Sequence, residues 1–341
     1  PSLARRSGSA AAGFAALVLC SLAVLRLWPF DSYAVAWDRW EAVRLLVTVA
    51  AATCPFVCAG LVIGGMLSEA GSRRHRLYAA NLAGSASGSL GALPLLAALG
   101  GEATLVVAAG LALLSAAMLV GREDAAEPDL RASTEAPSAW PPRQSGSLEL
   151  ASGSVPATPL APRPRHAVGG KRNAAPRRAS VTAAGLLLAL AWARPGWMAV
   201  TVSAYKALPQ ALQASGARHT VSEWDLAGRV DVVESPSIHV LPGLSEQAPI
   251  AVPPRQAGLT VDGDDLSPIT ALSAGDPEAG RLADHVPEAL AAHLRPGGRV
   301  LVLEPAGGWV VLTALAGGAR QVTAVERNPT IAAVLRRDYA D

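Results

Sequence analysis

The sequence predicts a multi-span α-helical membrane region, then a small β-rich lobe, and then the start of an α/β domain. Three observations predict this order. Residues 1–121 hold four long stretches without charge, and residues 203–272 contain short alternating apolar runs broken by turns. In residues 297–326 the spacing of apolar residues changes from that of a strand to that of a helix and back. A hydrophobic content of 51%, a charged content of 16% and a mean hydropathy of +0.30 agree with a membrane protein.

The four apolar stretches are residues 10–25, 45–66, 77–99 and 103–120. Each is near or above the length that crosses a hydrocarbon core of about 30 Å. No cleavage site follows the first stretch and more apolar segments come after it, which argues against a signal peptide. We therefore expect residues 1–121 to form a transmembrane region of about four spans whose partner is the lipid bilayer.

Arginines set the expected orientation of these spans. Arg73, Arg74 and Arg76 lie between the second and third spans, which puts that loop in the cytoplasm under the positive-inside rule. Residues 100–102 carry no positive charge and fall outside, and the fourth span returns the chain to the cytoplasm at Arg122. We expect a bacterial inner membrane location.

Two segments connect the spans to the rest of the chain. Residues 122–178 are rich in Pro, Ser, Ala and Arg and are expected to be a disordered linker. Residues 179–202 are apolar over only about 13 positions, fewer than the ~20 that a span needs, and a longer helix would include Arg194. If this segment spans, the C-terminal part lies outside, away from nucleotide-type cosubstrates. We expect a short membrane-associated helix and a cytoplasmic soluble part.

Residues 203–272 are expected to form a small β-rich lobe, with a helical or turn-like start at 205–213. Its predicted strands are residues 229–233, 238–241 and 258–261. Pro242-Gly243 and Asp262-Gly263 supply turns. An amphipathic helix is expected over 281–294, with His285 and His293 at its edges, where a lone histidine is usually structural.

Residues 297–326 read as a βαβ unit, which is almost always parallel and right-handed. Its parts are a strand at 299–303, a turn at 305–308, a helix at 310–316 and a strand at 321–325. Glu326 ends the second strand about 20 residues past the turn, where nucleotide-type folds place a carboxylate for ribose hydroxyls. We expect residues 273–341 to be the start of a Rossmann-like (class I methyltransferase-like) domain. The alternative is a plain βαβ unit with a surface glutamate.

Other functional classes are disfavoured by composition. A net charge of +2 without an arginine stripe argues against nucleic-acid binding. Cys20, Cys54 and Cys58 lie in apolar segments without further ligands nearby, so no metal site is expected. The GxGxxG spacing of dinucleotide enzymes is absent, and the spans carry no central acid or base for a transport path.

The chain resembles the spermidine synthase (polyamine aminopropyltransferase) family, and within it the bacterial membrane-anchored members. The resemblance covers most of the chain outside the linker and depends on the order of several short motifs. These are Leu77-Tyr78-Ala79-Ala80-Asn81-Leu82-Ala83-Gly84, Ala204-Tyr205-Lys206-Ala207-Leu208, Pro242-Gly243-Leu244-Ser245, Val261-Asp262-Gly263, Asp284-His285-Val286-Pro287 and Val325-Glu326-Arg327-Asn328-Pro329.

The resemblance implies transfer of an aminopropyl group from decarboxylated S-adenosylmethionine to putrescine, a small polyamine substrate. Glu326 would hold the ribose, and Gly307 and Gly308 would let the nucleoside approach the backbone. Glu304 would add a carboxylate to the same cosubstrate site. The matching positions for weaker substrate contacts are Tyr205, Asp262 and His285.

Two departures from the family pattern are expected to matter. The soluble enzymes carry a turn like GGGDGG, and here Gly307 replaces its aspartate while Glu304 and Ala306 replace glycines. The family's catalytic aspartate motif lies downstream of the position that matches Asp341, so the catalytic residues are unknown and this chain is expected to be an inactive fragment. Two alternatives stay open: a methyltransferase-like enzyme that uses S-adenosylmethionine, and a non-catalytic membrane protein that retains the fold. A homo-oligomer is also left open.

Overall fold

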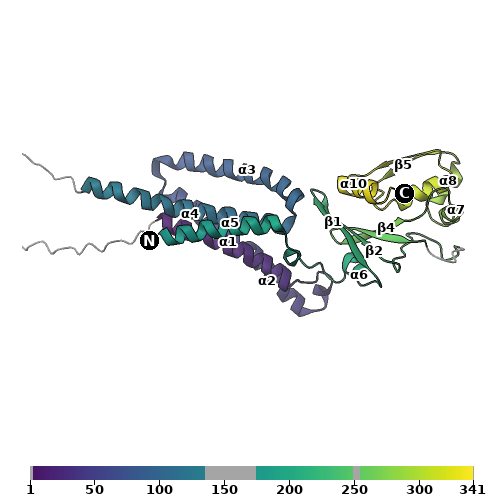
Figure 1. Ribbon diagram of the computed structural model, residues 1–341, viewed down its shortest axis with the longest axis horizontal. Helices are drawn as coiled ribbons and strands as arrows, with labels where there is room; N and C mark the ends of the chain where they lie inside the picture. Colours follow the sequence, from purple (N-terminus) through teal and green to yellow (C-terminus); the bar gives the residue numbers. More distant parts are fainter. Residues whose placement is uncertain (1–2, 135–173, 249–253, 341) are drawn as a thin grey trace, which may run out of the picture.

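The computed structural model describes residues 3–134, 174–248 and 254–340. It is elongated, with a helical bundle at one end and a smaller α/β domain at the other (Figure 1). The two parts meet where the connection between α3 and α4 touches the domain: the ring of Trp224 lies against Gly100 and Gly101.

Four helices are long and apolar enough to cross a membrane, which confirms the predicted transmembrane region. They are α1 (Leu3–Leu27), α2 (Arg39–Glu69), α3 (Arg74–Leu99) and α4 (Gly101–Thr134). Short 3-10 turns, η1 (Ala34–Ala36) and η2 (Gly71–Arg73), occur in the first two connections. The carboxylate of Asp38 caps α2 by accepting the N–H of Trp40.

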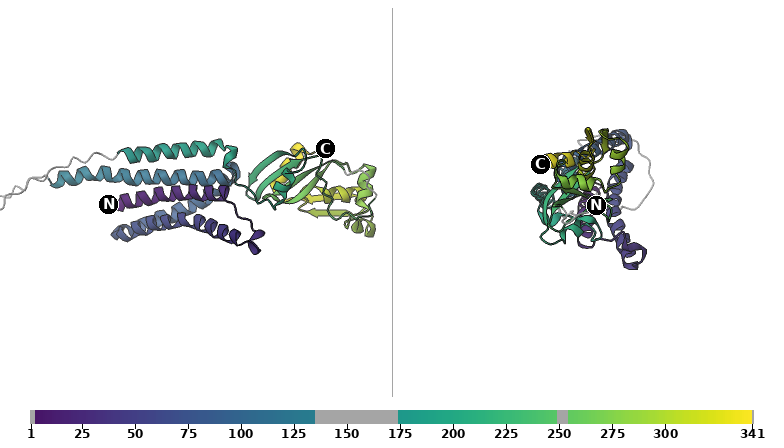
Figure 2. Two further views of the ribbon diagram at one scale, coloured as in Figure 1. Left: turned by 90° about the horizontal axis from the view of Figure 1, so that it is seen from below. Right: turned by 90° about the vertical axis from the view of Figure 1, so that its right-hand side faces the viewer.

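A fifth helix, α5 (Ala174–Ala193), lies along α4 in both side views (Figures 1 and 2). Its Ala184 and Ala191 are fully or almost fully buried, and Leu188 packs on Gly110. With 20 residues, α5 is about 30 Å long at 1.5 Å per residue. A face of small residues thus packs the segment against α4. Helix α5 is not among the described helices that are apolar enough to cross a membrane, so its placement at the membrane stays an expectation.

The predicted disordered linker is also too long at both ends. The backbone of α4 continues to Thr134, and α5 already begins at Ala174. The residues after Arg122 include Ala, Glu and Arg, which favour helix and can extend an existing one. The middle of the predicted linker, residues 135–173, lies outside the described residues.

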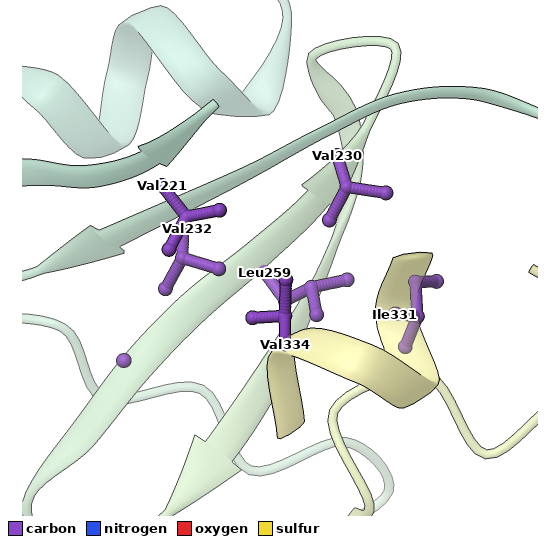
Figure 3. Packing of buried hydrophobic residues seen from close by; sticks show 7 residues of the cluster. Val221, Val230, Val232, Leu259, Ile331 and Val334 are labelled. Atoms are coloured by element: carbon purple, nitrogen blue, oxygen red, sulfur yellow. The ribbon is translucent and has the colours of Figure 1, made fainter. Parts of the chain in front are cut away.

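The first part of the domain is a four-stranded antiparallel sheet of order β1-β2-β3-β4, which confirms the β-rich lobe. The strands are β1 (Arg218–Asp225), β2 (Gly228–Glu234), β3 (Gln256–Val261) and β4 (Asp264–Thr270). Helix α10 (Pro329–Asp338) covers one face, where Val230, Val232 and Leu259 pack against Ile331 and Val334 (Figure 3). Helix α6 (Ala207–Leu212) covers the opposite face.

Two elements of the lobe differ from prediction. Residues 238–241 are not a strand, because the side-chain amide of Gln256 bonds both the N–H and the C=O of Val240 in place of a neighbouring strand. The helix expected over 281–294 is two helices, α7 (Pro277–Ala283) and α8 (Ala289–Leu294). Pro287 separates them, since proline disfavours helical conformation in the residue before it.

The second part of the domain contains the predicted βαβ unit. Strand β5 (Arg299–Leu303), helix α9 (Trp309–Ala316) and strand β6 (Gln321–Val325) follow one another, and the two strands pair in parallel. Leu301 and Leu303 remain 62% and 67% exposed, because this sheet has only two strands in the described chain. The unit is thus present, and a complete Rossmann-like domain stays an expectation.

Candidate nucleoside site

Glu326 lies at the carboxyl edge of the parallel pair and has a fixed orientation. One carboxylate oxygen accepts the N–H of Ala306 at 3.2 Å, and the other accepts the N–H of Asn328 at 2.8 Å. The residue is half-buried. Because each carboxylate oxygen can accept two hydrogen bonds, both oxygens retain room for one further donor.

The turn after β5 is conformationally unusual. Glu304, Ala306 and Gly308 have φ angles of 52°, 46° and 90°. The first two are L-residues in the left-handed region, which costs roughly 1–2 kcal/mol each. Such strain concentrates at ligand-binding and catalytic turns, where the surrounding fold compensates it.

Glu304 forms an ion pair with Arg327 at 3.3 Å across the carboxyl edge. Both side chains are well exposed, at 58% and 81%, so the pair contributes at most about 1 kcal/mol. Glu304 and Glu326 thus belong to one edge of the βαβ unit, with Glu304 as the more accessible carboxylate.

Gly307 packs closely against strand β4. A Cβ at this position would lie 2.4 Å from the carbonyl oxygen of Pro268, and the Gly307 N–H donates to the hydroxyl of Ser267 at 3.0 Å. The glycine therefore lets the turn pack on β4. At Gly308, by contrast, a Cβ would meet no atom within 4 Å, so the space beside the turn is open there.

The other three candidate residues have local partners of their own in the described structure. The ring of Tyr205 faces that of Tyr33, with centroids 6.3 Å apart. The carboxylate of Asp262 accepts the N–H of Arg229 at 2.9 Å, and its carbonyl accepts the Lys206 amine. Nδ1 of His285 lies 2.7 Å from the carbonyl oxygen of Arg281. The structure unites Glu304, Gly307, Gly308 and Glu326, and gives the other three local structural partners.

Sequence reasoning did not single out Asp225, which lies beside the site. Its carboxylate accepts the hydroxyl of Thr330 at 2.7 Å, which ties the β1–β2 turn to the start of α10. A cavity of about 580 Å³ lies here, between the end of α3 and the residues that follow Glu326. It is lined by Ala97, Asp225, Leu226, Ala227, Arg327 and Pro329. The signal for Asp225 is the turn Asp225-Leu226-Ala227-Gly228 between β1 and β2. It could not be identified because β1 was not predicted as a strand.

Asn328 belongs to the motif Val325-Glu326-Arg327-Asn328-Pro329, but no role of its own was predicted for it. It is buried, and its side-chain carbonyl caps α10 by accepting the N–H groups of Thr330 and Ile331. Its N–H then holds Glu326, so the helix cap and the carboxylate are positioned together. The side-chain nitrogen of Asn328 is buried without a hydrogen-bond partner among the described residues.

Among the residues that the structure describes, no three His, Cys, Asp or Glu side chains lie close enough together to hold a metal ion. Comparisons with protein-family models, with curated proteins and with solved structures find no match to this chain. Functional assignment therefore depends on the geometry of the site.

Proposed function

We propose that this chain is a membrane-tethered, spermidine synthase-like protein whose βαβ turn binds the nucleoside of decarboxylated S-adenosylmethionine. The observation that supports this best is Glu326, a carboxylate held by two backbone N–H groups at the carboxyl edge of parallel strands. A carboxylate that is already oriented accepts two vicinal hydroxyls without further loss of side-chain freedom. Gly308 leaves open space beside it.

The reaction that such a site serves is aminopropyl transfer. The amine nitrogen of a polyamine attacks the propyl carbon next to the sulfonium, the carbon–sulfur bond breaks, and its electron pair stays on sulfur to give methylthioadenosine. The proton lost from the new ammonium group needs a base. Glu304 is exposed at the same edge, and we assign it to holding the cationic acceptor close to the nucleoside.

Calorimetric titration of the full chain in detergent tests this assignment. The ligands are decarboxylated S-adenosylmethionine, S-adenosylmethionine and methylthioadenosine. Hydrogen bonds to a charged group contribute about 1.5–3 kcal/mol each, so we expect Glu326→Gln to weaken binding at least ~10-fold. Glu223→Gln is the matched control, because Glu223 pairs with Arg337 on the exposed side of β1. If S-adenosylmethionine binds more tightly than its decarboxylated form, the proposed reaction is methyl transfer and not aminopropyl transfer.

A second candidate is a non-catalytic membrane protein that retains the fold, and two observations favour it. Gly307 is occupied by its contact with β4 and does not open the turn to a ligand. Helix α5 also brings the domain to the end of the bundle opposite the Arg73–Arg76 segment (Figure 1). The positive-inside rule puts those arginines in the cytoplasm and hence the domain outside, away from cytoplasmic cosubstrates. This candidate predicts no heat with any of the three ligands.

A further inference from the structure

Aromatic side chains gather at one end of the helical bundle. Five of the eight tryptophans and one tyrosine are between 49% and 80% exposed there. We call this set the aromatic belt: Trp28, Tyr33, Trp37, Trp40, Trp192 and Trp197. It comes from two separate parts of the chain: the connection from α1 into the start of α2, and the end of α5 with η3 (Gly196–Met198).

Contacts between these parts put the belt at one level, next to the domain. The hydroxyl of Thr201 donates to the carbonyl of Arg26 at 2.9 Å, which joins the segment after η3 to the end of α1. The guanidinium of Arg194 donates to the carbonyl of Ala98 near the end of α3 at 3.0 Å. Tyr33 of the belt also faces Tyr205 at the start of the domain.

Neither water nor hydrocarbon suits these side chains. In water the five indoles would expose large apolar surfaces, and in hydrocarbon their N–H groups would lack acceptors, since no described residue bonds to them. The layer of lipid head groups satisfies both needs, which is why tryptophan and tyrosine concentrate at membrane interfaces. We infer that the aromatic belt lies in the head-group layer of the leaflet beside the domain and holds the domain against that surface.

Two further features agree with a lipid surface at this level. Leu226, at the tip of the β1–β2 turn, is 62% exposed and lines the cavity that Ala97 of α3 also lines. The tip therefore reaches the level where α3 leaves the bilayer, and Arg327, next to Glu326, lines the same cavity. Arg327 and Pro329, which follow Glu326 in the chain, thus lie close to the level of the head groups. This placement does not depend on the proposed function.

Depth-dependent fluorescence quenching tests the belt. The full chain is reconstituted into phosphatidylcholine–phosphatidylglycerol vesicles that carry a quencher either near the head group or near the end of the acyl chain. One variant replaces Trp140, Trp224 and Trp309 by phenylalanine and keeps the five belt tryptophans. We expect the shallow quencher to reduce its emission more than the deep quencher, and the emission to lie at shorter wavelength than that of indole in water.

The matched control keeps Trp309 alone, because this tryptophan is buried against Leu282 and Val286 in the domain. We expect neither lipid quencher to affect it. The unmodified chain provides a reading without substitutions and should show the same shallow preference, since five of its eight tryptophans are in the belt. Three results would overturn the inference. The first is stronger quenching by the deep label, and the second is quenching by aqueous iodide alone. The third is protection that grows with the protein-to-lipid ratio, which indicates a second copy of the chain.

Discussion

Gly307 connects the candidate site to the sheet at the scale of a single residue. Its missing side chain lets the turn approach the carbonyl of Pro268, a backbone atom that cannot rotate away. We expect Gly307→Ala to destabilise the domain by about 1–3 kcal/mol through overpacking. Chemical denaturation of the full chain in detergent measures this. Gly280→Ala is the control, because its new methyl meets nothing within 4 Å and lies in α7, so it should be neutral or slightly stabilising.

Asp231 is the most strongly buried charge of the domain that the structure describes. Its carboxylate is fully buried between His219 Nε2 at 2.9 Å and Arg229 Nε at 2.7 Å. The guanidinium in turn lies 6.0 Å from the ring centre of Trp224, at the junction with the bundle. This cluster links the sheet to the membrane region, although no pattern in the sequence singled it out.

Removing that charge should therefore be costly. We expect Asp231→Asn to lower the free energy of unfolding by about 3–5 kcal/mol, because Arg229 then stays buried without a counter-ion. Glu223→Gln breaks a solvent-exposed pair with Arg337 and should leave the free energy of unfolding nearly unchanged, because solvent screens such pairs. Denaturant titrations of both variants make the comparison, and equal effects would contradict a buried ionic link.

Helix α5 provides a matched pair of neighbours at the scale of elements. Ala184 is fully buried against α4, whereas Gly185 is exposed and has no atom within 4 Å of an added Cβ. Ala184→Leu should push α5 from Gly110 and cost about 1–3 kcal/mol. Gly185→Leu should be neutral or stabilising, since leucine favours helix and would face lipid. Thermal unfolding followed by circular dichroism separates the two, and similar midpoints would show that α5 does not pack in the bundle.

The same helix shows what the sequence could and could not predict. Long charge-free stretches gave the four spans, since length and polarity alone determine whether a helix can cross a bilayer. Helix α5 was underestimated because its contribution depends on which small residues face α4, and this is known only from packing. Strands β1 and β4 were missed for a similar reason, as Arg218–Asp225 and Asp264–Thr270 are largely polar. Each strand has a single buried residue, Val221 in β1 and Pro268 in β4, so neither shows the alternation that signals a strand.

The candidate site was predictable in outline because its elements depend on local sequence signals and not on packing. A strand, a small-residue turn, a helix and a second strand are all local signals, so β5, α9, β6 and the position of Glu326 followed from the sequence. The role of Gly307 in packing did not follow from the sequence, because its hydrogen bond to Ser267 joins residues 40 positions apart. The same holds for Asp225, whose bond to Thr330 spans 105 positions.

At the scale of the whole molecule, helix order determines which parts share a side of the membrane. The α2–α3 connection and the domain lie at opposite ends of the bundle (Figure 2). The four candidate spans and the packed helix α5 run in alternating directions along the bundle and produce this arrangement, whereas a re-entrant α5 would put both parts on the same side. The relative placement of these two parts therefore depends on α5 running along α4 from one end of the bundle to the other.

Labelling of single cysteines tests this placement. Cys20, Cys54 and Cys58 are first replaced by alanine, and one cysteine is then introduced as Ser72→Cys beside the arginines or as Ser237→Cys on the domain, both at exposed positions. We expect a membrane-impermeant maleimide to label only one of the two in intact cells, and both after permeabilisation. Labelling of both from one side would show that α5 does not cross.

Which of the two cysteines reacts in intact cells then decides between the candidate functions. The arginines beside Ser72 favour a cytoplasmic position for that loop, and reaction at Ser237→Cys alone would put Glu326 outside, where decarboxylated S-adenosylmethionine does not reach it. The non-catalytic candidate would then stand. Reaction at Ser72→Cys alone would put the domain in the cytoplasm with its cosubstrate, and the oriented carboxylate of Glu326 would keep the role in aminopropyl transfer that its geometry supports.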